Sequence, residues 1–228
     1  MSAIDVLGGH LFFMHMIQHL LIVMIAPPLL LLANPLPFVL WGLPEGKRVG
    51  QRLFSHGSRF RRALQQATQP AMVWFAFVAI LWGWHDPGLY SLAQGSGWLH
   101  DLEHLTFFGA AMLLWWHVVR AGPRVHDRFS PLARIGYLLA AAAANMVPGV
   151  VIALANAPLY PYYVGTPRVW GLTVMQDQVL SGLIMWIPGT MMYLLAALII
   201  LLRMLNRFET RAVGNRQPPP VGIAPSRP

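Results

Sequence analysis

The sequence contains no cysteine, and this absence limits both how the chain is held together and how it can bind metal. Without thiols there is neither a disulfide framework nor a thiolate metal site. Any metal ion would have to be bound by histidine, methionine, aspartate or glutamate.

Charged side chains are also scarce. They make up 11% of the 228 residues, whereas soluble domains carry about a quarter. Apolar residues make up 56%, and the mean hydropathy is +0.52. The pI near 10.8 does not indicate nucleic-acid binding, because the basic residues lie in short loops between apolar runs and not on a water-soluble domain. The composition predicts a protein whose partner is the lipid bilayer.

The apolar runs predict an all-α, polytopic transmembrane bundle of about five spans, since a crossing helix needs about 20 apolar residues. A basic leader and a small-residue cleavage site are missing from the N-terminus, so the first run is expected to be a span and not a cleaved signal. We assign residues 1–205 to the bundle and 206–228, rich in proline and polar residues at its end, to a disordered cytoplasmic tail. The expected spans are 11–33, 70–85, 101–120, 134–155 and 176–202.

The basic residues predict the orientation of the bundle. With these spans, every lysine and arginine except Arg168 falls on one side of the membrane. Because positively charged loops stay in the cytoplasm, we expect an outer N-terminus and a cytoplasmic C-terminus. Six histidines and most of the acidic residues then lie at the outer face.

Two helices each carry a pair of histidines at this outer face. His15 and His19 are four residues apart, as are His100 and His104, so each pair shares one face of its helix. Polar side chains in a membrane span are costly and tend to mark function. We therefore predict a metal site, with carboxylates that bind the ion or orient the rings. The candidate ligands are His15, His19, His85, His100, Glu103, His104 and Asp177.

Other interpretations of these residues stay open at this stage. A histidine pair on an apolar helix is often a hydrogen-bonded packing feature of a scaffold. Pro27 and Pro28 must kink or break the first span, and Pro148 and Pro188 are expected to do the same in later spans. Such breaks either admit a ligand or permit close helix packing. Imidazole suits zinc, copper and iron alike, and outer methionines would favour Cu(I).

Several stretches, taken together and in order, resemble the integral-membrane CtaG family of bacterial cytochrome c oxidase assembly factors. These stretches cover most of residues 14–195, and the ordered set is more specific than any single stretch. The matching stretches are HMIQHLLIVMIAPPLLLL from His15, WHDPGLY from Trp84, HDLEHLTFFGAAMLLWW from His100, LYPYY from Leu159 and MQDQVLSGLIMWIPG from Met175. Members of this family typically carry two further spans upstream, which would leave the orientation unchanged.

The resemblance implies a multi-pass protein of the bacterial plasma membrane that handles or inserts copper during maturation of cytochrome c oxidase. Its implied partners are oxidase subunits and a copper-donating chaperone, and no enzymatic turnover is expected. A b-type haem protein is the main alternative, because bis-imidazole ligation needs one histidine from each of two helices. The order H-x-x-E-H in HDLEH also matches inverted zincins, but so short a pattern is weak. Transport is less favoured, because the inner half lacks charged residues within the spans.

Overall fold

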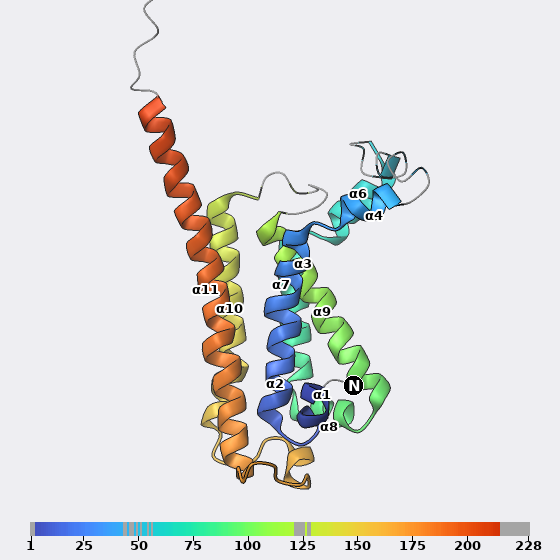
Figure 1. Cartoon of the computed structure of the whole chain (residues 1–228), viewed down its shortest axis with the longest axis vertical. Helices are drawn as coiled ribbons and strands as arrows, with labels where there is room; N and C mark the ends of the chain where they lie inside the picture. The colour runs from blue at the N-terminus through green and yellow to red at the C-terminus, as the bar shows by residue number, and fades with distance from the viewer. Residues whose placement is uncertain are drawn as a thin grey trace, which may run out of the picture.

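The described part of the chain is built from helices and contains no strand, as predicted (Figure 1). A computed structural model describes residues 3–42, 57–120 and 129–214, together with Glu45, Arg48, Gly50, Arg52, Leu53, Ser55 and His126. The helices are α1 (Ala3–Gly8), α2 (Phe12–Leu20), η1 (Leu21–Ile25), α3 (Ala26–Ala33), α4 (Leu36–Gly42), α6 (Arg59–Ala67), α7 (Pro70–Trp84), α8 (Pro87–Gln94), α9 (Gly97–Val119), α10 (Pro131–Leu154), η2 (Pro161–Val164) and α11 (Val174–Gly214).

Four helical segments are long and apolar enough to cross a membrane. They are the continuous stretch Phe12–Ala33, then α9, α10 and the part of α11 up to Thr210. The helices α6 and α7 meet at a bend of 50°, and they add a fifth span if the pair is counted as one. The predicted polytopic helical membrane protein is therefore confirmed, with four or five spans.

Several short helices of the described chain lie at the two ends of the bundle. The helices α1, α8 and η2 lie at one end, beside the starts of α2, α9 and α11, whereas α4, α6 and the last turns of α11 lie at the other (Figure 1). The helix α11 continues to Gly214, so residues 206–214 of the predicted tail belong to this helix. Residues 206–214 include good helix formers such as arginine, glutamate and alanine, which extend the helix past its apolar part. The rest of the predicted tail, 215–228, lies outside the described residues.

A tryptophan completes the hydrogen bonding of the first span where proline interrupts it. Pro27 has no backbone N–H, so the carbonyl group of Val23, four residues earlier, has no helical donor. The indole Nε1 of Trp115 on α9 donates to this oxygen at 2.9 Å. The turn before the proline is the π-helix η1. The predicted interruption of the first span is thus a local widening, which is stabilised by a neighbouring helix.

The same arrangement recurs in α10. Pro148 leaves the carbonyl group of Ala144 without its helical donor, and Trp82 of α7 donates its Nε1 to that oxygen at 2.9 Å. Of the expected kink or break, a break is absent at both prolines, because α10 continues through Pro148 and α11 continues through Pro188. In membrane helices, side chains of neighbouring helices satisfy the groups that proline frees.

This pairing predicts a measurable coupling between Trp82 and Pro148. We expect Trp82→Phe to lower the free energy of unfolding by about 1 kcal/mol, because one buried carbonyl group loses its donor. In a Pro148→Ala background the same change should cost much less, since the alanine amide supplies the donor. Unfolding of the four proteins in detergent measures the coupling. Equal costs in both backgrounds would show that the indole bond does not compensate for the proline.

Glycines allow α10 and α11 to pack closely. A Cβ atom added to Gly182 would lie 2.6 Å from the carbonyl oxygen of Gly149, and one added to Gly149 would lie 2.9 Å from the backbone nitrogen of Trp186. No side chain fits at such distances, so the two backbones touch here. Of the two interpretations of the proline-glycine motifs, close helix packing is the one these contacts support.

Candidate metal centre

The first pair of histidines lies on α2, whose start is fixed by a distant carboxylate. Asp177 on α11 accepts hydrogen bonds from the backbone N–H groups of Phe12 and Phe13, both at 2.9 Å. The residue at the N-cap, Leu11, has no side chain that can cap the helix, so Asp177 takes that function. One turn further along α2, His15 and His19 are buried on the face that looks toward α9.

The second pair lies in the first turns of α9, with Glu103 beside it. The rings of His15 and His104 have centroids 5.7 Å apart, and those of His19 and His104 are 5.2 Å apart. The ring of His100 lies 5.3 Å from that of His15. The convergence of histidines from separate helices, predicted from helical spacing and from the distribution of basic residues, is present in the structure.

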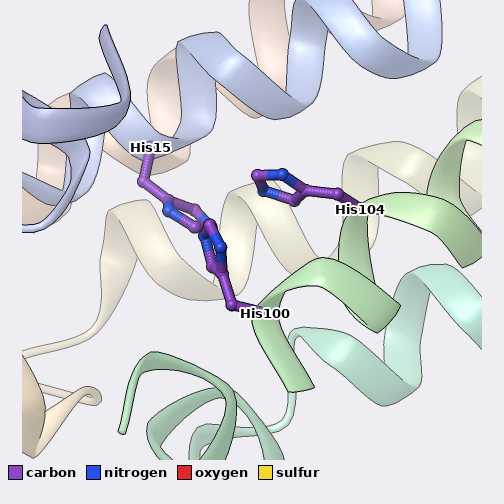
Figure 2. Close-up of side chains that lie close together, drawn as sticks. All are labelled: His15, His100 and His104. Atoms are coloured by element: carbon purple, nitrogen blue, oxygen red, sulfur yellow. The ribbon is translucent and has the colours of Figure 1, made fainter. Parts of the chain in front are cut away.

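The ligand atoms form two overlapping groups. In each group one ligand atom per residue lies within 4.8 Å of the others. The outer group is His15, His100 and His104, whose rings converge in the space between α2 and α9 (Figure 2). The inner group is His15, His19 and Glu103. Two atoms that bind one ion at about 2.0–2.1 Å are at most about 4.2 Å apart, so small side-chain rotations would complete either site.

The two groups differ in their access to the surface. His100 and His104 are half-buried, whereas the inner group is enclosed: His15 is 1% exposed, His19 6% and Glu103 0%. His15 belongs to both groups and therefore connects a more accessible site with a closed one. An ion bound at the outer group would share one ligand, His15, with the inner group.

Several of these polar atoms are buried without a hydrogen-bond partner among the described residues. They are both ring nitrogens of His19, Nε2 of His104 and both carboxylate oxygens of Glu103. Oε1 of Glu103 lies 3.5 Å from Nε2 of His19 and 3.9 Å from Nε2 of His15, but neither contact is a hydrogen bond. Buried polar groups are nearly always paired, so a cluster of unpaired ones needs an explanation. Here the unpaired atoms are ones that can bind a metal ion, and a bound cation would supply their missing partner. The donor set fits a metal ion.

His85, the residue that follows α7, approaches the inner group from the other side. Its Nδ1 bonds the carbonyl oxygen of Leu81 at 2.7 Å, which leaves Nε2 as the nitrogen that can bind an ion. The rings of His85 and His19 are 6.0 Å apart. Both line a cavity of about 30 Å³ that Met16, Met24 and Met185 also line. This volume is about that of one water molecule in the liquid, so the cavity holds one small ion or water molecule.

Asp177 does not join either group. Its oxygens accept from the start of α2, and Arg168 lies 3.6 Å away, at ion-pair distance. Its prediction as a metal ligand gains no support here, because its carboxylate, at the start of α11, contacts the first turn of α2 and not the histidines. The sequence predicts that Asp177 lies near the outer face, but it does not show which helix start Asp177 caps.

The structure adds contacts that sequence reasoning missed. Nε2 of Gln94 lies 3.5 Å from Nε2 of His15, the limit of a hydrogen bond. Tyr160 donates to the backbone carbonyl of His85 at 2.8 Å, and Tyr163 donates to that of Gly8 at 2.9 Å. Burial raises the pKa of Tyr160 and Tyr163, so these hydroxyl groups stay protonated and remain donors. Both tyrosines belong to the stretch LYPYY, which could have indicated these contacts but entered the prediction only through the family resemblance.

Comparison with known proteins gives relatives that are themselves named as uncharacterized proteins. An uncharacterized protein of Mycobacterium bovis and one of Mycobacterium tuberculosis are each 25% identical over 191 residues, which is 81% of this chain and 28% of theirs. An uncharacterized protein of Mycobacterium leprae is 24% identical over the same shares. The chain thus spans under a third of the length of these relatives. No solved structure matches.

A protein-family comparison is more informative, because it covers nearly the whole chain. The model of the cytochrome c oxidase caa3 assembly factor family matches residues 1–207, a range that includes both histidine pairs and, among the described residues, all but the last three residues of the candidate membrane spans. This agrees with the resemblance of the ordered histidine and tyrosine stretches. The chain is therefore a membrane protein that belongs to the family of cytochrome c oxidase caa3 assembly factors.

Proposed function

We propose that this protein binds copper at the outer face of the bacterial plasma membrane and delivers it to cytochrome c oxidase during assembly. The observation that carries the proposal is the convergence of His15, His100 and His104, from two helices, with ligand atoms within 4.8 Å of one another. Membership in an oxidase assembly family supplies the recipient. Copper is here a cargo that is bound and released, so the proposal involves no enzymatic turnover.

The donor set supports copper over harder ions. Imidazole suits zinc, copper and iron, while thioether sulfur selects Cu(I). The three methionines in the cavity beside His19 and His85 therefore favour Cu(I) in its inner part. With no thiolate available, binding is of moderate strength and the ion is exchangeable. Exchange is what a carrier needs if it receives copper from a chaperone and gives it to an oxidase subunit.

The alternatives from the sequence receive less support. A haem needs a slot for the porphyrin, but the cavity beside His19 holds about 30 Å³, far less than the roughly 300 Å³ or more of typical ligand pockets. A hydrolase of the inverted-zincin type needs a glutamate that reaches a water molecule, but Glu103 is 0% exposed. In a scaffold whose histidines are purely structural, the buried ring nitrogens of His19 would be expected to have hydrogen-bond partners, but neither nitrogen has one among the described residues.

Metal binding by detergent-purified protein tests the proposal. We expect the wild-type chain to bind at least one Cu(I) per chain in competition with a chromophoric chelator, and to bind Zn(II) more weakly. His19→Ala/His104→Ala removes one imidazole from each helix and should abolish this binding. The control is His117→Ala, which removes a buried imidazole of α9 outside both groups. Wild-type protein that binds no copper, or that has a Soret band, would contradict the proposal.

Cells that lack the protein provide the second measurement. Their cytochrome c oxidase should retain haem absorption but lose the signals of its copper centres, and the wild-type gene should restore them. The double variant should fail to restore them while it accumulates to normal levels in the membrane. An oxidase with full copper content in the deletion strain would show that delivery is not the function.

A further inference from the structure

A large apolar groove lies at the end of the bundle opposite the histidines. It has a volume of about 880 Å³, comparable with pockets that enclose drug-sized ligands. The helices α3, α9, α10 and α11 line it, together with the end of η1. Exposed side chains such as Leu29, Leu32 and Leu195 line it, so it opens toward the lipid and not into the protein core.

Four arginines line one end of this groove. Arg120 caps the C-terminus of α9, Arg134 lies in the first turns of α10, and Arg203 and Arg207 lie one turn apart on α11. None of the four forms an ion pair with an acidic side chain of the described residues. Like charges close together repel, and an anion bound among them would relieve this repulsion.

Arg134 links the charged end to the apolar wall. Its Nη1 donates to the carbonyl oxygen of Val118, in the last turn of α9, at 3.0 Å. Its Nε is buried and has no hydrogen-bond partner in the described part of the chain. A guanidinium group with a free donor beside three other cations is suited to bind the oxygens of a phosphate group.

We propose that the groove binds an anionic phospholipid of the cytoplasmic leaflet. Its phosphate would lie among the guanidinium groups, and an acyl chain would follow the apolar wall between α3 and α11. The position of the groove along the membrane normal suits a phospholipid. The arginines mark the cytoplasmic end of the bundle, where the phosphate would lie, and the groove extends from them toward the membrane centre, where the acyl chain would lie. Basic pockets between transmembrane helices on that side are known to suit such headgroups. The site is independent of copper.

Charge argues against a second copy of this chain as the occupant. The acidic residues predicted for the cytoplasmic side are only Glu45, Asp127 and Glu209, against an excess of arginines. A second copy would therefore bring more positive charge to an end that already repels itself. A phospholipid supplies both the negative charge and the apolar surface that the groove requires.

Native mass spectrometry of the full chain in mixed micelles tests the proposal. With equal amounts of phosphatidylglycerol and phosphatidylcholine, we expect wild-type protein to retain phosphatidylglycerol preferentially. Arg203→Gln/Arg207→Gln should weaken this preference at least about tenfold, since each cation near the membrane surface contributes about a factor of five. Both side chains are exposed, so the fold should persist.

Two further variants separate the groove from general surface charge. Arg59→Gln/Arg62→Gln removes the same charge from exposed positions on α6, outside the groove, and should leave the preference unchanged. Ala196→Phe fills the apolar wall without altering any charge and should reduce lipid retention. Equal retention of the two lipids by the wild type would overturn the proposal, as would a preference unaffected by Ala196→Phe. A dimer with the groove at its interface would also overturn it.

Discussion

Replacing His15 with alanine is expected to abolish copper binding at both ligand groups. His15 is the one residue that the outer and inner groups share, so each would keep only two ligands. Loss of a residue that merely orients a ligand lowers metal affinity by about 10–100-fold, and loss of a ligand should exceed the upper end of that range. We therefore expect the apparent Cu(I) affinity to fall by more than about 100-fold.

Competition with a Cu(I) chelator measures this fall, and two other variants make it interpretable. Glu103→Gln keeps the volume of the side chain and removes only the charge, so it should weaken binding at the inner group and spare the outer one. His117→Ala should change neither. If His15→Ala and His117→Ala bind copper equally well, the imidazoles that converge between α2 and α9 are a packing feature and the proposed function loses its basis.

Much of this cluster could be predicted because it depends on two regularities. Helical spacing puts His15 and His19 on one face, and His100 and His104 on another. The distribution of basic residues then puts both pairs at one end of the bundle. Neither regularity fixes how each helix is rotated about its axis, which is decided by packing against its neighbours. The division into an outer and an inner group, with His15 in both, therefore required coordinates.

The failures concern residues whose partners are distant in sequence. The prolines were expected to kink or break their spans, but the carbonyl groups that they free accept hydrogen bonds from Trp115 in the first span and from Trp82 in α10. Both tryptophans come from other helices. Sequence spacing on a single helix carries no information about these pairs, so the continuity of α10 through Pro148 could not be predicted.

Asp177→Ala is expected to destabilise the protein strongly without removing a metal ligand. The buried carboxylate accepts from the N–H groups of Phe12 and Phe13 and lies at ion-pair distance from Arg168. Removing one partner from a buried charged network costs about 3–5 kcal/mol, because the remaining groups are left unpaired. Asp177→Asn should cost less, since its carbonyl oxygen still accepts one of the two hydrogen bonds.

Unfolding in detergent measures the stability of these variants, and copper stoichiometry of the folded fraction separates the two roles of a carboxylate. Asp101→Ala is the matched control, because Asp101 is an exposed acid at the same end of the bundle. We expect folded Asp177→Ala protein to bind as much copper per chain as the wild type, since α2 still carries both histidines. A stable Asp177→Ala protein that has lost its copper would instead make Asp177 a ligand, and the cap on α2 would then contribute little to the fold.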